Sequence, residues 1–179
     1  MRATTCIGAV LGLILLHAPS VAEAAKVDLP RYPSISPDGS TVAFTWRGDI
    51  WSVPATGGTA VRLTNHPALE LRSAFSPDGK TLAFNSSRLG GGNIFLMNVD
   101  GSKVRPLTLT DRVLQLSGFS SDGSRVLFSS SRESDVYRAV RPYSVGIGNE
   151  ADEESGGGAI ERLMDCFGES PQMSPDGTK

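Results

Sequence analysis

The chain has 179 residues, of which 39% are hydrophobic and 20% are charged, and its formal net charge is −2. This near-neutral balance argues against a nucleic acid or an anionic membrane as a partner, because either would require a clustered basic surface. The 20 glycines and 11 prolines exceed the usual share but stay below the level typical of disorder, so a globular chain rich in turns is predicted. Length alone would suggest one ordinary domain.

The first segment has the layout of a secretory signal peptide. A positive residue, Arg2, precedes an apolar run over Cys6–Leu16, and the small residue Ala24 completes a cleavage site. The run is too short to span a membrane, which takes about 20 residues. We therefore predict that residues 1–24 are removed, that no membrane insertion remains, and that the mature chain is exported to a bacterial periplasm. Residues 25–32 then form a short lead-in.

A four-residue motif, Ser-Pro-Asp-Gly, organises the rest of the chain. In a tight turn Pro presets its backbone angle, Asp bonds nearby backbone groups and Gly accepts the left-handed conformation that follows. The third copy has Ser121 in place of Pro, which the same turn tolerates. The copies lie at Ser36–Gly39, Ser76–Gly79, Ser120–Gly123 and Ser174–Gly177.

Each of the first three motifs precedes a set of short alternating strands. An apolar strand ends in Phe, a second strand has Asp or Asn before a β-branched and an aromatic residue, and a closing strand comes after a turn. The first strands contain Thr41–Phe44, Thr81–Phe84 and Arg125–Phe128, the second Asp49–Trp51, Asn93–Phe95 and Asp135–Tyr137, and the closing ones Arg62–Thr64, Arg105–Thr108 and Ala159–Met164. The alternation and the even spacing indicate strands rather than helices.

Four antiparallel strands in a repeat of about 40–45 residues are typical of a β-propeller blade. We therefore predict an all-β fold after the signal peptide: an incomplete β-propeller of about three four-stranded blades and the start of a fourth. A β-sandwich would not repeat the same turn, aromatic residue and closing strand in register. The expected boundaries are 33–68 for blade 1, 69–110 for blade 2, 111–166 for blade 3 and 167–179 for a truncated blade 4.

The third unit departs from the pattern near residues 146–158, which are rich in Gly and acidic residues. We interpret this stretch as an exposed loop inserted between the last two strands of blade 3. Its acidic residues, at 150–154, lack the spacing of a calcium-binding loop. No metal site is therefore predicted there.

These repeats resemble the TolB-like, or Tricorn-type, β-propeller repeat, which is a WD40-like family. The run Gly48–Gly58, followed by Arg62–Pro67, is similar to the opening blade of Tricorn-like serine proteases. In that family a propeller stands ahead of a PDZ domain and a C-terminal peptidase domain and is thought to filter or guide substrate. TolB carries an α/β domain in front of its propeller, whereas the first blade here begins soon after the predicted cleavage site. The resemblance therefore implies a Tricorn-like propeller more than TolB itself.

The mature chain offers few groups for catalysis. After cleavage, His66 and Cys166 are its only histidine and cysteine, so neither an internal disulfide nor a zinc site is predicted. His66 lies between two blades, where it packs or caps a turn, and no G-x-S-x-G nucleophile elbow is present. We predict no catalytic, metal-binding or cofactor-binding residue and no cofactor, and the ligand-binding residues stay open.

Three aromatic residues, Trp51, Phe95 and Tyr137, recur at matched positions of the three units. We expect them to pack between neighbouring blades, because aromatic side chains contribute much of the energy of such interfaces. The alternative is that they form recognition surfaces around a central channel.

Three functional hypotheses follow. The first is an exported non-catalytic propeller that binds or gates peptides for the peptidase domain of a Tricorn-like serine protease. The second is a TolB-like periplasmic scaffold that binds envelope proteins, and the third is a propeller that precedes an amidohydrolase-type metal domain. The expected partner is a peptide or protein ligand, or a C-terminal peptidase domain, and not a nucleic acid. Whether the parent protein is an enzyme stays open.

Overall fold

The structure is a computed structural model, and it describes residues 26–133, 140–148, 157–174 and 176. The predicted signal peptide, the strand expected at Asp135–Tyr137 and the acidic residues at 150–154 lie outside the described residues. No helix in the described part of the chain is long and apolar enough to cross a membrane.

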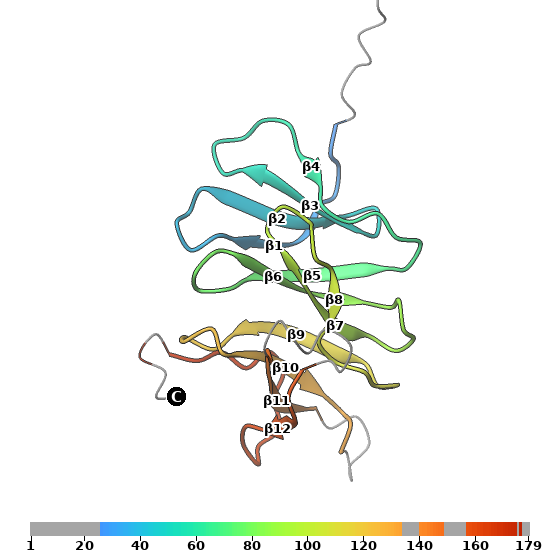
Figure 1. Cartoon of the computed structure of the whole chain (residues 1–179), viewed down its shortest axis with the longest axis vertical. Coiled ribbons are helices and arrows are strands. Elements are labelled where there is room, and N and C mark those ends of the chain that lie inside the picture. The colour runs from blue at the N-terminus through green and yellow to red at the C-terminus, as the bar shows by residue number, and fades with distance from the viewer. Residues whose placement is uncertain (1–25, 134–139, 149–156, 175, 177–179) are drawn as a thin grey trace, which may run out of the picture.

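Twelve strands in the described residues form three antiparallel sheets of four strands each, stacked one on the next (Figure 1). Blade 1 contains β1 (Arg31–Ile35), β2 (Thr41–Trp46), β3 (Asp49–Pro54) and β4 (Val61–Arg62). Blade 2 contains β5 (Glu70–Phe75), β6 (Thr81–Ser86), β7 (Asn93–Asn98) and β8 (Arg105–Pro106). Blade 3 contains β9 (Leu114–Phe119), β10 (Arg125–Ser130), β11 (Arg141–Gly146) and β12 (Ile160–Arg162). In each sheet the strands lie in chain order, which confirms the predicted all-β propeller blades.

The Ser-Pro-Asp-Gly motif forms the turn that joins the first two strands of each blade. In blade 1 the Ser36 hydroxyl donates to Asp38 at 2.5 Å, and the Asp38 carboxylate accepts the Ser40 amide at 3.0 Å. Gly39 is left-handed, with φ 72°. The same two bonds recur in blades 2 and 3. The turns therefore place equivalent residues at equivalent positions in all three blades.

Blade 3 differs from the prediction at β11, the strand that corresponds to β3 and β7 in the other two blades. The sequence motif placed this strand at Asp135–Tyr137, but Arg141–Gly146 forms it, and Tyr143 stands opposite Phe128. Burial decides this register, because Tyr143 and Val145 are buried in the cluster that joins blade 3 to blade 2. A local motif cannot show which segment reaches that cluster. The closing strands β4, β8 and β12 are also shorter than predicted, at two or three residues each.

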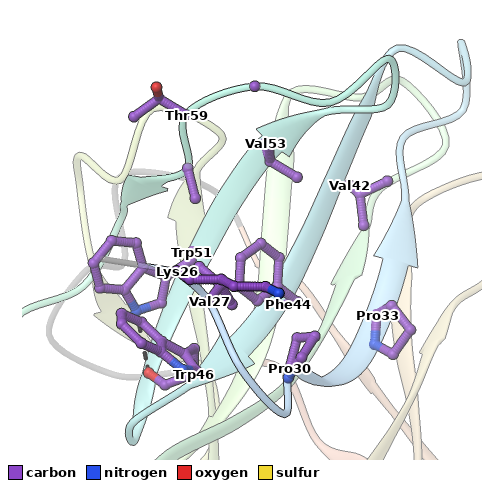
Figure 2. Close-up of a pocket in the computed structure, with 12 residues that line it drawn as sticks. Lys26, Val27, Pro30, Pro33, Val42, Phe44, Trp46, Trp51, Val53 and Thr59 are labelled. Atoms are coloured by element: carbon purple, nitrogen blue, oxygen red, sulfur yellow. Dashed lines mark hydrogen bonds between the residues drawn. The ribbon is translucent and has the colours of Figure 1, made fainter. Parts of the chain in front are cut away.

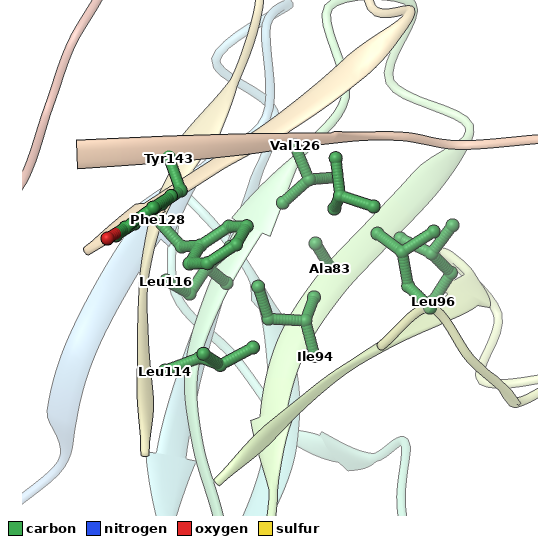
Figure 3. Packing of buried hydrophobic residues seen from close by; sticks show 10 residues of the cluster. Ala83, Ile94, Leu96, Leu114, Leu116, Val126, Phe128 and Tyr143 are labelled. Atoms are coloured by element: carbon green, nitrogen blue, oxygen red, sulfur yellow. The ribbon is translucent and has the colours of Figure 1, made fainter. Parts of the chain in front are cut away.

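The core lies between the blades. Blades 1 and 2 each present a face with a small Ala and an Ile, and the next blade covers this face with an aromatic pair. The groups are Ala43 and Ile50 against Phe84 and Phe95, and Ala83 and Ile94 against Phe128 and Tyr143. Figure 3 shows the second cluster, in which Val126 and Phe128 of blade 3 lie around Ala83 and Ile94 of blade 2. Phe95 thus packs between two blades, as predicted for the aromatic of each unit.

Candidate functional site

The first strands of the blades lie side by side, because β1 packs beside β5 and β5 packs beside β9. Two adjoining hollows lie along these strands, next to the β2–β3 and β6–β7 hairpins. The first hollow, beside the β2–β3 hairpin, has a volume of about 320 Å³, and the second, beside the β6–β7 hairpin, has a volume of about 310 Å³. Both are lined by Tyr32, Leu69 and Leu71. We call the two hollows together the inner-strand groove. Its other main lining residues are Arg31, Arg47 and Arg72.

Backbone strain gathers in this groove. Leu29, Tyr32, Arg47 and Arg72 all line it, and their φ angles of 48–52° place them in the left-handed region that favours glycine. Tyr32 and Arg72 lie where the β1–β2 and β5–β6 pairings lose register. Each such residue costs about 1–3 kcal/mol, and strain of this kind clusters at functional sites. The groove is therefore the candidate functional site.

The groove combines aliphatic and cationic groups. Leu29, Leu69 and Val113 expose large parts of their side chains. The guanidinium of Arg72 lies 4.6 Å from the centre of the ring of Tyr32, which lines both hollows. Such a surface can bind an extended peptide or protein segment through its side chains, and it supplies no nucleophile–base pair.

A buried ion pair supports the groove from below. Glu70 lies between the lining residues Leu69 and Leu71, is fully buried, and accepts a hydrogen bond from Arg88 Nε at 2.7 Å. The Arg88 guanidinium also lies 5.5 Å from the centre of the Phe95 ring. Because Arg88 belongs to the β6–β7 connection, this pair ties that hairpin to the start of β5.

The carboxylates of the turn motifs lie at the opposite end of β2 and its equivalents. A hydrogen bond from the Ser36 hydroxyl is the main cause that lowers the pKa of Asp38 to about 2. The Ser120 hydroxyl likewise lowers the pKa of Asp122 to about 2. The blades therefore carry anionic turns at one end and the arginine-lined groove at the other.

A larger hollow, of about 690 Å³, opens on blade 1 (Figure 2). It is lined by apolar side chains that include Phe44, Trp46, Trp51 and Val53. Trp51 stands opposite Phe44, as the aromatic pairs of blades 2 and 3 do, so this is the aromatic face of blade 1. In the other two blades the equivalent face packs against a neighbouring blade. A sheet-packing surface therefore explains this hollow better than a small-molecule site.

The histidine and the cysteine considered in the sequence lie outside the inner-strand groove. His66 accepts the Ala68 amide at Nδ1, 3.0 Å away, as a turn-capping residue does. Cys166 is an exposed free thiol, and within the described ranges no three His, Cys, Asp or Glu residues gather as a metal site would require. Sequence reasoning missed Tyr32 and Arg72. Their only signal is that each stands four residues before a Ser-Pro-Asp-Gly motif.

The chain is similar in sequence to a known protein family and to individual proteins. Residues 27–179 match the family model of the Tricorn protease N-terminal beta propeller domain. An uncharacterized protein of Agrobacterium fabrum is 35% identical over 162 residues, which cover 84% of this chain and 53% of the relative. Tricorn protease homolog 1 of Streptomyces coelicolor is 31% identical over 116 residues, or 61% of this chain and 10% of that protein.

Solved structures show the same fold. A protein assigned as TolB from Agrobacterium tumefaciens superimposes with a TM-score of 0.68 at 30% identity, covering 86% of this chain and 57% of that one. TolB from Acinetobacter baumannii gives a TM-score of 0.69 at 24% identity, covering 84% and 36%. The chain thus spans about half the length of the Agrobacterium relatives that it matches.

Proposed function

The chain belongs to the Tricorn protease N-terminal β-propeller family, and on this premise we propose that it is an exported, non-catalytic module that binds an extended peptide or protein segment in the inner-strand groove. In a Tricorn-like serine protease such binding would gate or guide substrate toward a peptidase domain. The observation that carries the proposal is the concentration of left-handed, non-glycine residues in a groove with exposed aliphatic side chains.

A TolB-like scaffold that binds envelope proteins is the second candidate. It is favoured by the two TolB-named structures, which superimpose on most of this chain. Both candidates use the propeller as a binding surface, and they differ in what is bound. A short extended peptide is expected to suffice as ligand for the gating role, whereas the scaffold role requires a folded envelope protein.

The experiment compares two leucines of nearly equal exposure. Leu69, at 53%, lines the groove, and Leu89, at 52%, does not. The purified full chain is titrated into a labelled library of extended peptides, and binding is followed by fluorescence anisotropy. We expect Leu69→Asp to abolish binding and Leu89→Asp to leave it unchanged.

Peptidase assays on the same peptides complete the test. The bound peptides are expected to stay intact through prolonged incubation with the chain. Turnover that disappears in a His66→Ala variant would contradict the non-catalytic assignment. Binding of folded envelope proteins without binding of short peptides would favour the scaffold role instead.

A further inference from the structure

The inner-strand groove carries an excess of positive charge. Arg31 and Arg47 line its first hollow, and both are exposed. Neither forms an ion pair within the described part of the chain, and the lining of that hollow includes no carboxylate. Arg72 in the second hollow likewise has no acidic partner among the described residues. The chain as a whole is slightly acidic, so this local excess runs against its composition.

Two acidic residues, Asp28 and Glu70, are next to groove-lining residues along the chain, and both have other partners. The Asp28 carboxylate accepts the indole N–H of Trp46 at 3.3 Å. Glu70 is fully buried and paired with Arg88 beneath the groove. Within the described residues, neither carboxylate forms an ion pair with the arginines that line the groove.

Aromatic rings hold two of these arginines in place. The Arg47 guanidinium lies 4.5 Å from the centre of the Trp46 ring, and Arg72 lies 4.6 Å from the centre of the Tyr32 ring. A guanidinium stacked on a ring keeps its N–H edge open for a carboxylate, with less conformational freedom to lose on binding. The buried hydroxyl of Thr45, which also lines the first hollow, has no hydrogen-bond partner in the described residues.

From this arrangement we infer that the groove binds an acidic segment: an extended peptide in which Asp or Glu side chains alternate with aliphatic ones. The carboxylates pair with Arg31 and Arg47, and the aliphatic side chains pack on Leu29 and Leu69. This inference rests on the proposed function, because it specifies the ligand of the same groove. Charge complementarity of this kind determines selectivity and association rate more than it adds raw affinity.

The probe is a fluorescein-labelled peptide of three Leu-Glu-Ser repeats, acetylated and amidated at its ends so that only side chains carry charge. Its matched control contains three Leu-Gln-Ser repeats. Both are titrated against the full chain at low and at physiological salt. We expect the Glu peptide to bind more tightly than the Gln peptide, with an advantage that shrinks as salt rises.

Variants with equal changes in net charge locate the effect. The double variant Arg31→Gln/Arg47→Gln is expected to lose about fivefold in affinity for the Glu peptide, as two exposed ion pairs would. Lys80→Gln/Arg112→Gln removes two exposed cations outside the groove and is expected to change nothing. Circular dichroism spectra confirm that each variant is folded.

The outcomes separate the two proposals. Equal binding of both peptides, lost in Leu69→Asp, would overturn the acidic-segment inference and leave the groove as a peptide site. An equal loss in both double variants would also overturn the inference, because the effect would then follow net charge alone. Failure of every peptide to bind would overturn the proposed function and the inference with it.

Discussion

Asn85 is expected to hold blade 2 to blade 3, and replacing it with Ala tests this role. Its side-chain NH₂ donates to the Leu114 carbonyl at 2.9 Å, and its side-chain oxygen accepts the Leu116 amide at 3.0 Å, both on β9. Leu114 and Leu116 are buried, so Asn85→Ala leaves a backbone acceptor and a backbone donor without these partners. Each costs about 1–3 kcal/mol, so the free energy of unfolding is expected to fall by about 2–6 kcal/mol.

Urea unfolding followed by circular dichroism measures this loss. With a slope of about 2 kcal/mol per molar urea, the midpoint falls by about 1–3 M. Ser129 is the matched control, because it occupies the same position in β10 that Asn85 occupies in β6. Ser129 is 1% exposed and Asn85 is 7% exposed, yet the Ser129 hydroxyl has no partner in the described residues. Ser129→Ala is therefore expected to leave stability unchanged or slightly raised.

The comparison can refute the reasoning. Equal losses in the two variants would mean that burial, and not hydrogen bonding across the blades, decides the cost. An unchanged midpoint in Asn85→Ala would mean that water or a shifted backbone replaces the two bonds at little cost.

Two further predictions concern the turns and blade 1. Because the pKa values of Asp38 and Asp122 are lowered to about 2, their contribution to stability is present above the ordinary value of 3.8 and is lost as pH falls toward 2. Asp122→Asn should therefore reduce the fall of the urea midpoint at low pH. An unchanged fall would mean that the Asp122 carboxylate does not contribute to it. The open aromatic face of blade 1 predicts that the chain self-associates. In sedimentation velocity, Trp51→Lys should reduce this association and Leu89→Lys, at an exposed leucine outside this face, should not. A chain that sediments as a monomer without any substitution would disprove the prediction.

Much of the fold could be predicted from local chemistry. The Ser-Pro-Asp-Gly turn depends on residues within one turn of chain, so Ser36, Asp38 and Gly39 make the expected bonds and backbone angles. The strands that follow could be predicted for the same reason, since alternation records which face is buried. Blade 3 is the exception. The local motif predicts the strand at Asp135–Tyr137, but the strand that pairs with β10 is Arg141–Gly146, which places Tyr143 in the core.

The residues of the inner-strand groove could not be predicted from the sequence. Tyr32 and Arg72 belong to different blades, and the local signal that they share, a place four residues before a Ser-Pro-Asp-Gly motif, does not show that their side chains meet. Their left-handed backbones arise where the inner strands bulge against the second strands, which is a property of pairing and not of residue type. Only the packing of β1 beside β5 brings the two side chains together.

The sequence by itself therefore determined the repeat, the turn chemistry, the all-β class and the family, because each is recorded in residues close together along the chain. Tertiary structure decided which aromatic enters the core of blade 3, where strain collects, and which arginines share one groove. These depend on contacts between residues of different blades, such as the Ser34 and Ser73 hydroxyls that meet at 3.2 Å between β1 and β5. Such contacts form only when whole blades pack.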